Sequence, residues 1–160
     1  MKFSAEHEFP AHAELVAMLM VDPEFEVNVQ LPDLSRPEIV EHTVGGAVTV
    51  LALRYEFTGY IEPIAKKVIA GQRLTWVQRL ELDMTELRGE MSIVFDSQPD
   101  RVRANATVAL RDVADGCVRS IAGDFVVKIP LLGGKAEQAI VPGVLTRLDA
   151  EADAIRADLS

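Results

Sequence analysis

Apolar and polar residues alternate along much of this chain, a pattern that predicts β-strands more often than helices. The alternation is clearest in four segments of the second half, residues 73–82, 87–95, 101–111 and 117–129. Successive side chains of a strand point to opposite faces of a sheet, so each segment should turn one apolar face toward a core. Turn-forming residues separate the segments, which indicates consecutive hairpins and therefore an antiparallel sheet.

The beginning of the chain predicts a strand followed by short helices. Residues 2–9 alternate loosely and end at Pro10. Apolar residues then recur at helical spacing over residues 11–20, and Asp22-Pro23 ends this helix. Phe25 could anchor a second helical turn directly afterwards.

A β-hairpin is predicted where Gly45-Gly46 separates two β-rich segments, residues 38–44 and 47–57. Two glycines supply the positive φ angles of a two-residue turn, and this turn would pair His42 with Thr49. One face of the hairpin would then carry Val40, His42, Thr49, Leu51, Leu53, Tyr55 and Phe57.

Two features in the middle of the chain allow alternatives. Arg54 and Glu56 are expected on the outer face of the sheet, but a register shifted by one residue would turn them into the interior. Residues 61–70 form either a short helix that starts at Pro63 and ends at Gly71, or an apolar loop. This segment either acts as a lid over a cavity or simply packs against the edge of the sheet.

The last element is a long amphipathic helix. After Gly133-Gly134, apolar residues at steps of three and four form one stripe over about 25 residues. The stripe consists of Ile140, Val144, Leu148, Ala152, Ile155 and Leu159. Pro142 lies within it and predicts a kink or a loose first turn. We therefore expect an α+β fold in which this helix packs on a curved antiparallel sheet of about seven strands.

This order of elements resembles the helix-grip fold of the START-like superfamily, also called SRPBCC, as a single domain over residues 1–160. The resemblance rests on the strand and helix of residues 3–19 with Asp22-Pro23 after them, and on residues 123–137, which look like the last strand and the glycine turn into the final helix. The superfamily includes lipid-transfer domains, birch-pollen-allergen-like proteins and polyketide cyclases. Within it, the chain is similar to an uncharacterised bacterial family named only as a domain of unknown function. The resemblance implies a cavity between sheet and helix, and no fixed catalytic motif.

Composition and charge narrow the classes of function. The 160 residues are 49% hydrophobic and include one cysteine, so the chain can bury a core without disulfides, and a multi-cysteine metal site is excluded. The net charge is −9, and residues 1–41 contain nine acidic and two basic residues. We interpret these acids as a solvated surface, which repels nucleic acid and anionic lipid.

The sequence also shows no membrane span and no signal peptide. No apolar run reaches the roughly 18–20 residues of a span, and the first residues contain no apolar stretch of signal-peptide length. We therefore expect a cytoplasmic protein with no nucleic-acid partner and no stable membrane association.

No motif supports catalysis, a cofactor or a metal. The Gly-Gly-Lys at residues 133–135 lacks the first glycine and the Ser or Thr of a phosphate-binding loop. Pro10 interrupts any helix that would align His7 and His12 as zinc ligands. Cys117 has no expected base beside it. We expect no catalytic residue, no cofactor and no metal ligand.

Polar residues on apolar faces are the most informative candidates for a site. Gln78 stands between Trp76 and Leu80, and His42 and Tyr55 fall on the inner face of the first hairpin. A buried polar group without a partner costs about 1–3 kcal/mol, so each needs a partner in the core, a water or a ligand. A mostly apolar pocket with a few polar groups is typical of small-molecule sites. The predicted cavity lining is His42, Leu53, Tyr55, Trp76, Gln78, Leu80, Ile93, Val108, Phe125, Val144 and Leu148.

Three functions follow from this pattern. The first is binding of a small hydrophobic ligand (a lipid, isoprenoid or polyketide-like molecule), with polar ends oriented by Gln78, His42 and Tyr55. The second is a protein-interaction domain with a filled core. The third is an enzyme of the polyketide cyclase or aromatase kind, for which the inner face shows no carboxylate beside His42 and Tyr55.

Overall fold

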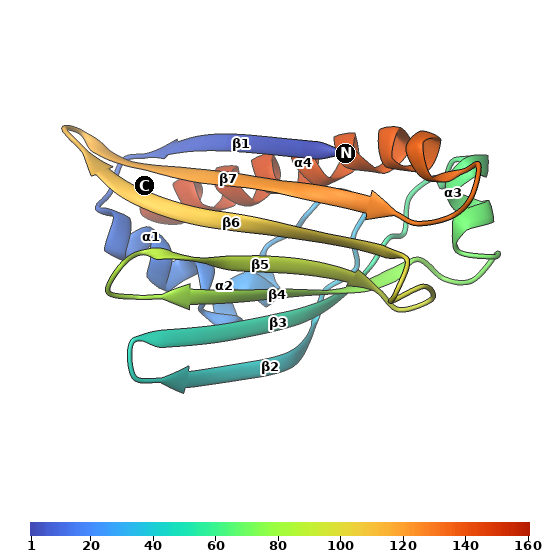
Figure 1. Cartoon of the computed structure of the whole chain (residues 1–160). Helices are drawn as coiled ribbons and strands as arrows, with labels where there is room; N and C mark the ends of the chain where they lie inside the picture. The colour runs from blue at the N-terminus through green and yellow to red at the C-terminus, as the bar shows by residue number, and fades with distance from the viewer.

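Seven antiparallel strands form one curved sheet in the order β1-β7-β6-β5-β4-β3-β2 (Figure 1). The structure is a computed structural model that describes residues 1–160. The strands are β1 (Lys2–Phe9), β2 (Glu38–Gly45), β3 (Val48–Glu56), β4 (Thr75–Asp83), β5 (Arg88–Phe95), β6 (Val102–Val113) and β7 (Gly116–Val127). The helices are α1 (Ala13–Met20), α2 (Pro23–Asn28), α3 (Pro63–Val68) and α4 (Gly133–Leu159). The predicted α+β architecture, with short helices after the first strand and a long final helix, is confirmed.

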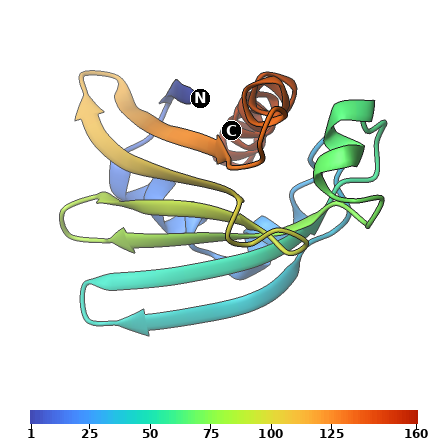
Figure 2. The same cartoon turned by 45° about the vertical axis from the view of Figure 1, so that its right-hand side comes forward.

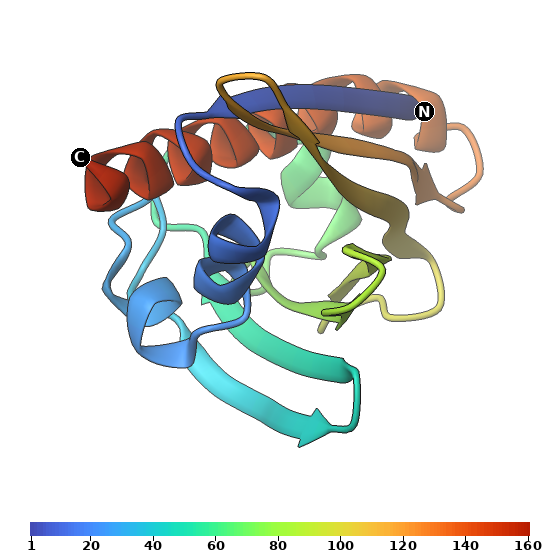
Figure 3. The ribbon, with the colours of Figure 1, turned by 90° about the vertical axis from the view of Figure 1, so that its left-hand side faces the viewer.

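The sheet curls around α4, which lies along its concave face (Figure 2). This helix packs against β1 and β7 on one side and against α3. The short helices α1 and α2 lie near the C-terminal half of α4, and α3 lies toward its N-terminal half (Figure 3). The space between sheet and α4 is therefore bounded by α1 and α2 at one end and by α3 at the other.

The predicted alternation places the core on the concave face. The buried side chains of β6 are Val102, Ala104, Ala106, Val108 and Leu110. An aromatic row crosses the sheet, in which Tyr55 stacks on Trp76 and Trp76 on Phe95, with ring centroids 6.0 and 5.7 Å apart. Phe95 then meets Phe125 edge-on at 5.9 Å. Such aromatic pairs contribute about 0.5–1.5 kcal/mol each beyond their burial, so this row stiffens the middle of the sheet.

The predicted turn of the first hairpin is wrong by one residue, which moves each pair by two residues and leaves His42 and the residues of β3 on their predicted faces. The central residues of the turn are Gly46 and Ala47, and His42 consequently pairs with Leu51 instead of Thr49. A turn whose first central residue has a positive φ needs only one glycine, and Gly46 has φ +59°. Leu51 is buried, but His42 is exposed because β2 is the free edge of the sheet. The expected position of His42 in the interior is therefore also wrong.

The structure shows which form the two uncertain helical segments, residues 61–70 and the start of the final helix, adopt. Residues 61–70 contain α3, with Pro63 in its first turn, so the helical interpretation is correct. The final helix runs through Pro142 without a break, and the hydroxyl of Thr146 donates to the Pro142 carbonyl at 3.0 Å. A Cβ on Gly133 would collide with the Val127 carbonyl oxygen, so glycine allows α4 to begin directly against the end of β7.

Candidate functional site

A cavity of about 380 Å³ lies between the concave face of the sheet and the middle of α4. Its inner wall is apolar, with Trp76 and Phe125 from the sheet and Ile140 and Val144 from α4. The segment that leads into α3 forms the mouth, where Tyr60 is 77% exposed. Small-molecule sites typically have volumes of about 300–1,000 Å³, so this cavity has a suitable size.

The predicted lining residues divide between this cavity and a smaller void. The residues on the cavity are Trp76, Ile93, Phe125 and Val144. Those on a separate void of about 20 Å³ are Leu53, Gln78, Leu80, Val108 and Leu148. Such a void holds about one water, so these five residues belong to the packed part of the core. Tyr55 is buried against Trp76 and lines neither space, and His42 lies far outside on β2.

A buried polar network borders the small void and joins α4 to the sheet. Arg119 on β7 is fully buried and donates to the Glu151 carboxylate and, at 3.3 Å, to the Leu148 carbonyl. Its Nη2 also lies 3.1 Å from Nδ1 of His7 on β1. The other ring nitrogen of His7 lies 2.8 Å from the Asp149 carboxylate. The network therefore holds α4 against β1 and β7.

Two buried carboxyl groups in this region have opposite pKa shifts. Burial raises the pKa of Glu26, on α2, well above its usual value, and the negative charge of Glu151 raises it further. Burial also opposes ionisation of Glu151, but the guanidinium groups of Arg119 and Arg147 outweigh this effect and hold its pKa below the usual value. The arrangement favours a protonated Glu26 beside an ionised Glu151.

Arg147 connects this charged cluster to the cavity. Its side chain lines the cavity, is only 6% exposed, and places its guanidinium carbon 5.6 Å from the centre of the Tyr55 ring. Neither Nη1 nor Nη2 of Arg147 has a hydrogen-bond partner, and neither does Nε1 of Trp76. All of these groups are donors, and they belong to two residues that line the cavity.

The predicted site did not include several of these polar residues, although the sequence pattern around some of them indicates a buried position. Arg119 has the same parity on its strand as Phe125, which indicates an inward position. Arg147 and Glu151 stand one helical turn apart beside the apolar stripe of the final helix. Glu26 lies in a six-residue helix, too short for a periodic pattern to show which face is buried.

Arg54 and Glu56, which a register shifted by one residue would have turned into the interior, lie on the outer face of the sheet. Arg54 forms an ion pair with Asp96 at 3.2 Å, and Glu56 pairs with Arg73. Both therefore point away from the cavity, as the unshifted register predicts.

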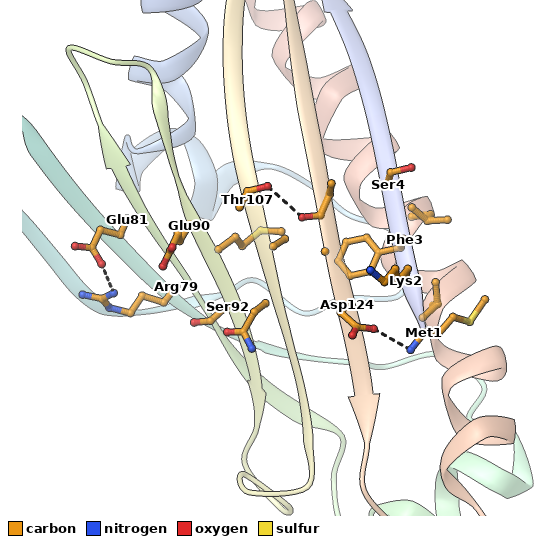
Figure 4. A pocket seen from close by; sticks show the side chains of 17 residues that line it. Met1, Lys2, Phe3, Ser4, Arg79, Glu81, Glu90, Ser92, Thr107 and Asp124 are labelled. Atoms are coloured by element: carbon orange, nitrogen blue, oxygen red, sulfur yellow. Dashed lines mark hydrogen bonds and ion pairs between the residues drawn. The ribbon is translucent and has the colours of Figure 1, made fainter.

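A wider hollow of about 950 Å³ is lined mainly by polar side chains of β1, β4, β5, β6 and β7 (Figure 4). Several of its charged groups are paired: Arg79 contacts Glu41 and Glu81 at 3.3 and 2.9 Å, and Asp124 contacts the N-terminal amino group at 3.1 Å. Exposed pairs of this kind are well solvated and contribute little, so we assign the candidate site to the apolar cavity and not to this hollow.

The curved sheet wrapped around a long final helix, with a cavity between them, is the helix-grip fold found in START-like (SRPBCC) proteins. The model of the family described as "Protein of unknown function (DUF2505)" matches residues 4–158. The chain belongs to this family. A search of curated proteins finds no match to its sequence.

Solved structures share this fold over nearly the whole chain. Protein TTHA0849 from Thermus thermophilus superposes with a TM-score of 0.68 at 20% identity, covering 100% of both chains. The Zhui aromatase/cyclase from Streptomyces sp. R1128 gives 0.63 at 16% identity, covering 99% of this chain and 92% of that one. Norcoclaurine synthase from Thalictrum flavum gives 0.64 at 18% identity, with 99% and 86% covered. These TM-scores, at such low identities, show a common fold and nothing more.

None of the helices is long and apolar enough to cross a membrane.

Proposed function

We propose that this protein binds a small hydrophobic molecule in the cavity between the sheet and α4. The observation that carries this proposal is the cavity itself, in which 13 of the 19 lining residues are hydrophobic. Burial of apolar surface contributes about 25 cal/mol per Å², so an oily ligand gains affinity from this wall without a dedicated motif. Two solved structures with the same fold are named as an aromatase/cyclase and a norcoclaurine synthase, which agrees with this use of the cavity.

The segment around α3 is the proposed lid. Ile61 and Ala65 line the cavity from this side, and α3 packs against α4. Apolar segments beside a pocket commonly gate it, so a small movement of α3 would open the mouth. The net charge of −9 favours a carrier or sensor in the cytoplasm over one that docks on an anionic membrane.

An enzyme of the cyclase kind is the second candidate, and the carboxyl pair favours it. Glu26 and Glu151 have pKa values shifted in opposite directions, as acid and base groups of active sites often do. However, both border the void of about 20 Å³ and neither lines the larger cavity, so we rank this candidate after ligand binding. Conversion of a polyketone mimic by the wild type, abolished in Glu26→Gln, would support it. A product profile equal to that of the protein-free reaction would reject it. The cavity weighs against an interaction domain with a filled core.

Calorimetric titration with decanol tests the binding function. Burying about ten carbons at about 0.8 kcal/mol each gives an upper limit near 8 kcal/mol, which corresponds to a Kd of about 1 μM. Val144→Trp fills the cavity from α4 and should abolish the binding. Val77→Trp, a control that makes the same substitution on the outer side of β4, should leave it unchanged. The absence of binding by the wild type, or equal binding by Val144→Trp, would overturn the proposal.

A further inference from the structure

We propose that the ligand of the cavity carries a carboxylate and that Arg147 binds this head group. The inference rests on the proposed hydrophobic binding and names the chemical class of the ligand. Its basis is the position of Arg147, which is almost completely buried and lines the cavity with both terminal nitrogens unpaired.

Unpaired donors are the first reason for an acidic ligand. A buried donor without a partner costs about 1–3 kcal/mol, and the cost is larger when the group is charged. The two terminal nitrogens of a guanidinium form a planar fork that matches the two oxygens of a carboxylate. The Trp76 indole nitrogen on the same cavity wall is also a donor without a partner. A ligand that supplies acceptor oxygens therefore fits this wall better than one that supplies donors.

The neighbouring side chains do not use the fork of Arg147. Glu151 lies one helical turn further along α4, but its carboxylate accepts a hydrogen bond from Arg119. Tyr55 offers the face of its ring, which contributes a cation–π contact and leaves the in-plane donors free. Both terminal nitrogens of Arg147 therefore lack a partner within the protein.

The charge of the buried cluster is the second reason. Arg119 and Arg147 are cationic, the two guanidinium groups lower the pKa of Glu151, and burial raises the pKa of Glu26. Glu151 therefore ionises more readily than Glu26, and with Glu151 alone ionised the four groups have one excess positive charge. A monoanionic carboxylate balances this charge, whereas a dianionic phosphate would exceed it.

The other charged groups around the site change this balance little. His7 is engaged with Arg119 and with Asp149, whose side chain is 68% exposed. Asp33 and Glu62 lie at the mouth and are exposed, so water and salt screen them over about 10 Å. Of the charged residues that line the cavity, Arg147 is therefore the one that solvent and salt screen least.

The volume of the cavity limits the size of the ligand. A volume of 380 Å³ holds about a dozen non-hydrogen atoms, if each takes the roughly 30 Å³ that a water takes. Decanoate has this size, and decanol is a nearly identical chain without the charge. The pair separates the contribution of the head group from that of the apolar chain.

The test compares the Kd values of decanoate and decanol by calorimetric titration at neutral pH. The variants are Arg147→Met, which removes the charge, Arg147→Lys, which keeps the charge without the fork, and Arg103→Met, a control on the outer face of β6. We expect Arg147→Met to raise the Kd for decanoate about ten- to a hundredfold. Its Kd for decanol should rise much less, because a neutral hydroxyl accepts a weaker hydrogen bond than a carboxylate does. Retained decanol binding also shows that the variant folds with an intact cavity. The Kd of Arg147→Lys for decanoate should lie between those of the wild type and of Arg147→Met. The Kd values of Arg103→Met should match those of the wild type.

The outcomes separate this inference from the function on which it rests. Equal Kd values of the wild type for both probes, or an unchanged Kd of Arg147→Met for decanoate, would overturn the carboxylate inference and leave hydrophobic binding intact. Failure of both probes to bind the wild type would overturn both proposals. If Arg147→Met does not fold, an Arg147→Lys variant that binds decanoate as the wild type does would contradict the role of the fork.

Discussion

Replacing Glu26 with glutamine should change how the stability of this protein depends on pH. Glu26 is buried, and burial together with the nearby charge of Glu151 raises its pKa well above 4.5. The folded protein therefore holds this proton more tightly than the unfolded chain does. The stability that Glu26 contributes is fully present below about pH 4.5, and it is lost as the pH rises toward the folded-state pKa. Glutamine keeps the shape of the side chain and has no proton to lose.

The size of the effect follows from the linkage between proton binding and folding. In the window between the two pKa values, each pH unit removes about 1.4 kcal/mol of stability from the wild type relative to Glu26→Gln. Glu151 does not interfere, because its lowered pKa means that its contribution is present above pH 4.5 and is lost only as the pH falls below that value.

Urea unfolding of the wild type and of Glu26→Gln at several pH values rising from about 5 measures this difference directly. The free energy of unfolding of the variant minus that of the wild type should increase as the pH rises toward the folded-state pKa. Glu24→Gln, on the exposed side of the same helix, is the matched control and should show no such trend. Parallel pH profiles for the wild type and Glu26→Gln would refute the protonated state of Glu26, and with it the positive charge of the buried cluster.

Three further substitutions test the packing around the site. Arg119→Leu should cost about 3–5 kcal/mol in urea unfolding because it leaves Glu151 short of a buried partner, and the double variant with Glu151→Leu should lose less than the sum of the single losses. Additive losses would show that the two side chains do not interact. Asp96→Asn breaks the partly exposed pair with Arg54 and should cost less than about 1 kcal/mol, so a larger loss would contradict the assignment of this pair to the outer surface. Gly133→Ala should lower thermal stability by about 1–3 kcal/mol because the new methyl group meets the end of β7, and an unchanged melting temperature would contradict that contact.

The strands and their inward faces were predictable because alternation is a local property of the chain. On β4, Trp76, Gln78 and Leu80 point inward as their parity requires. The turn of the first hairpin was not predictable, because two adjacent glycines allow it at either of two positions. The exposure of His42 was not predictable either, since alternation does not show which strand forms the free edge of the sheet.

The cavity was more accessible to prediction than its polar groups. Trp76, Phe125 and Val144 belong to apolar patterns that meet wherever a helix covers a sheet, and all three line the cavity. Glu26 belongs to an acidic segment that was interpreted as a solvated surface, yet its side chain is only 3% exposed. The burial of Arg147 was equally unexpected, because a charged residue beside an apolar helical stripe usually reaches water. Their burial depends on how α2, α4 and the sheet meet, which no local pattern encodes.

The most direct test of a carboxylate-binding cavity is a crystal structure of the protein with decanoate that carries a terminal bromine. Anomalous scattering locates the bromine without interpretation of weak density. We predict one bromine peak inside the cavity between Trp76 and Val144, with the carboxylate on the guanidinium of Arg147. A bromine peak in the wider polar hollow, or no peak at a saturating concentration, would contradict this account.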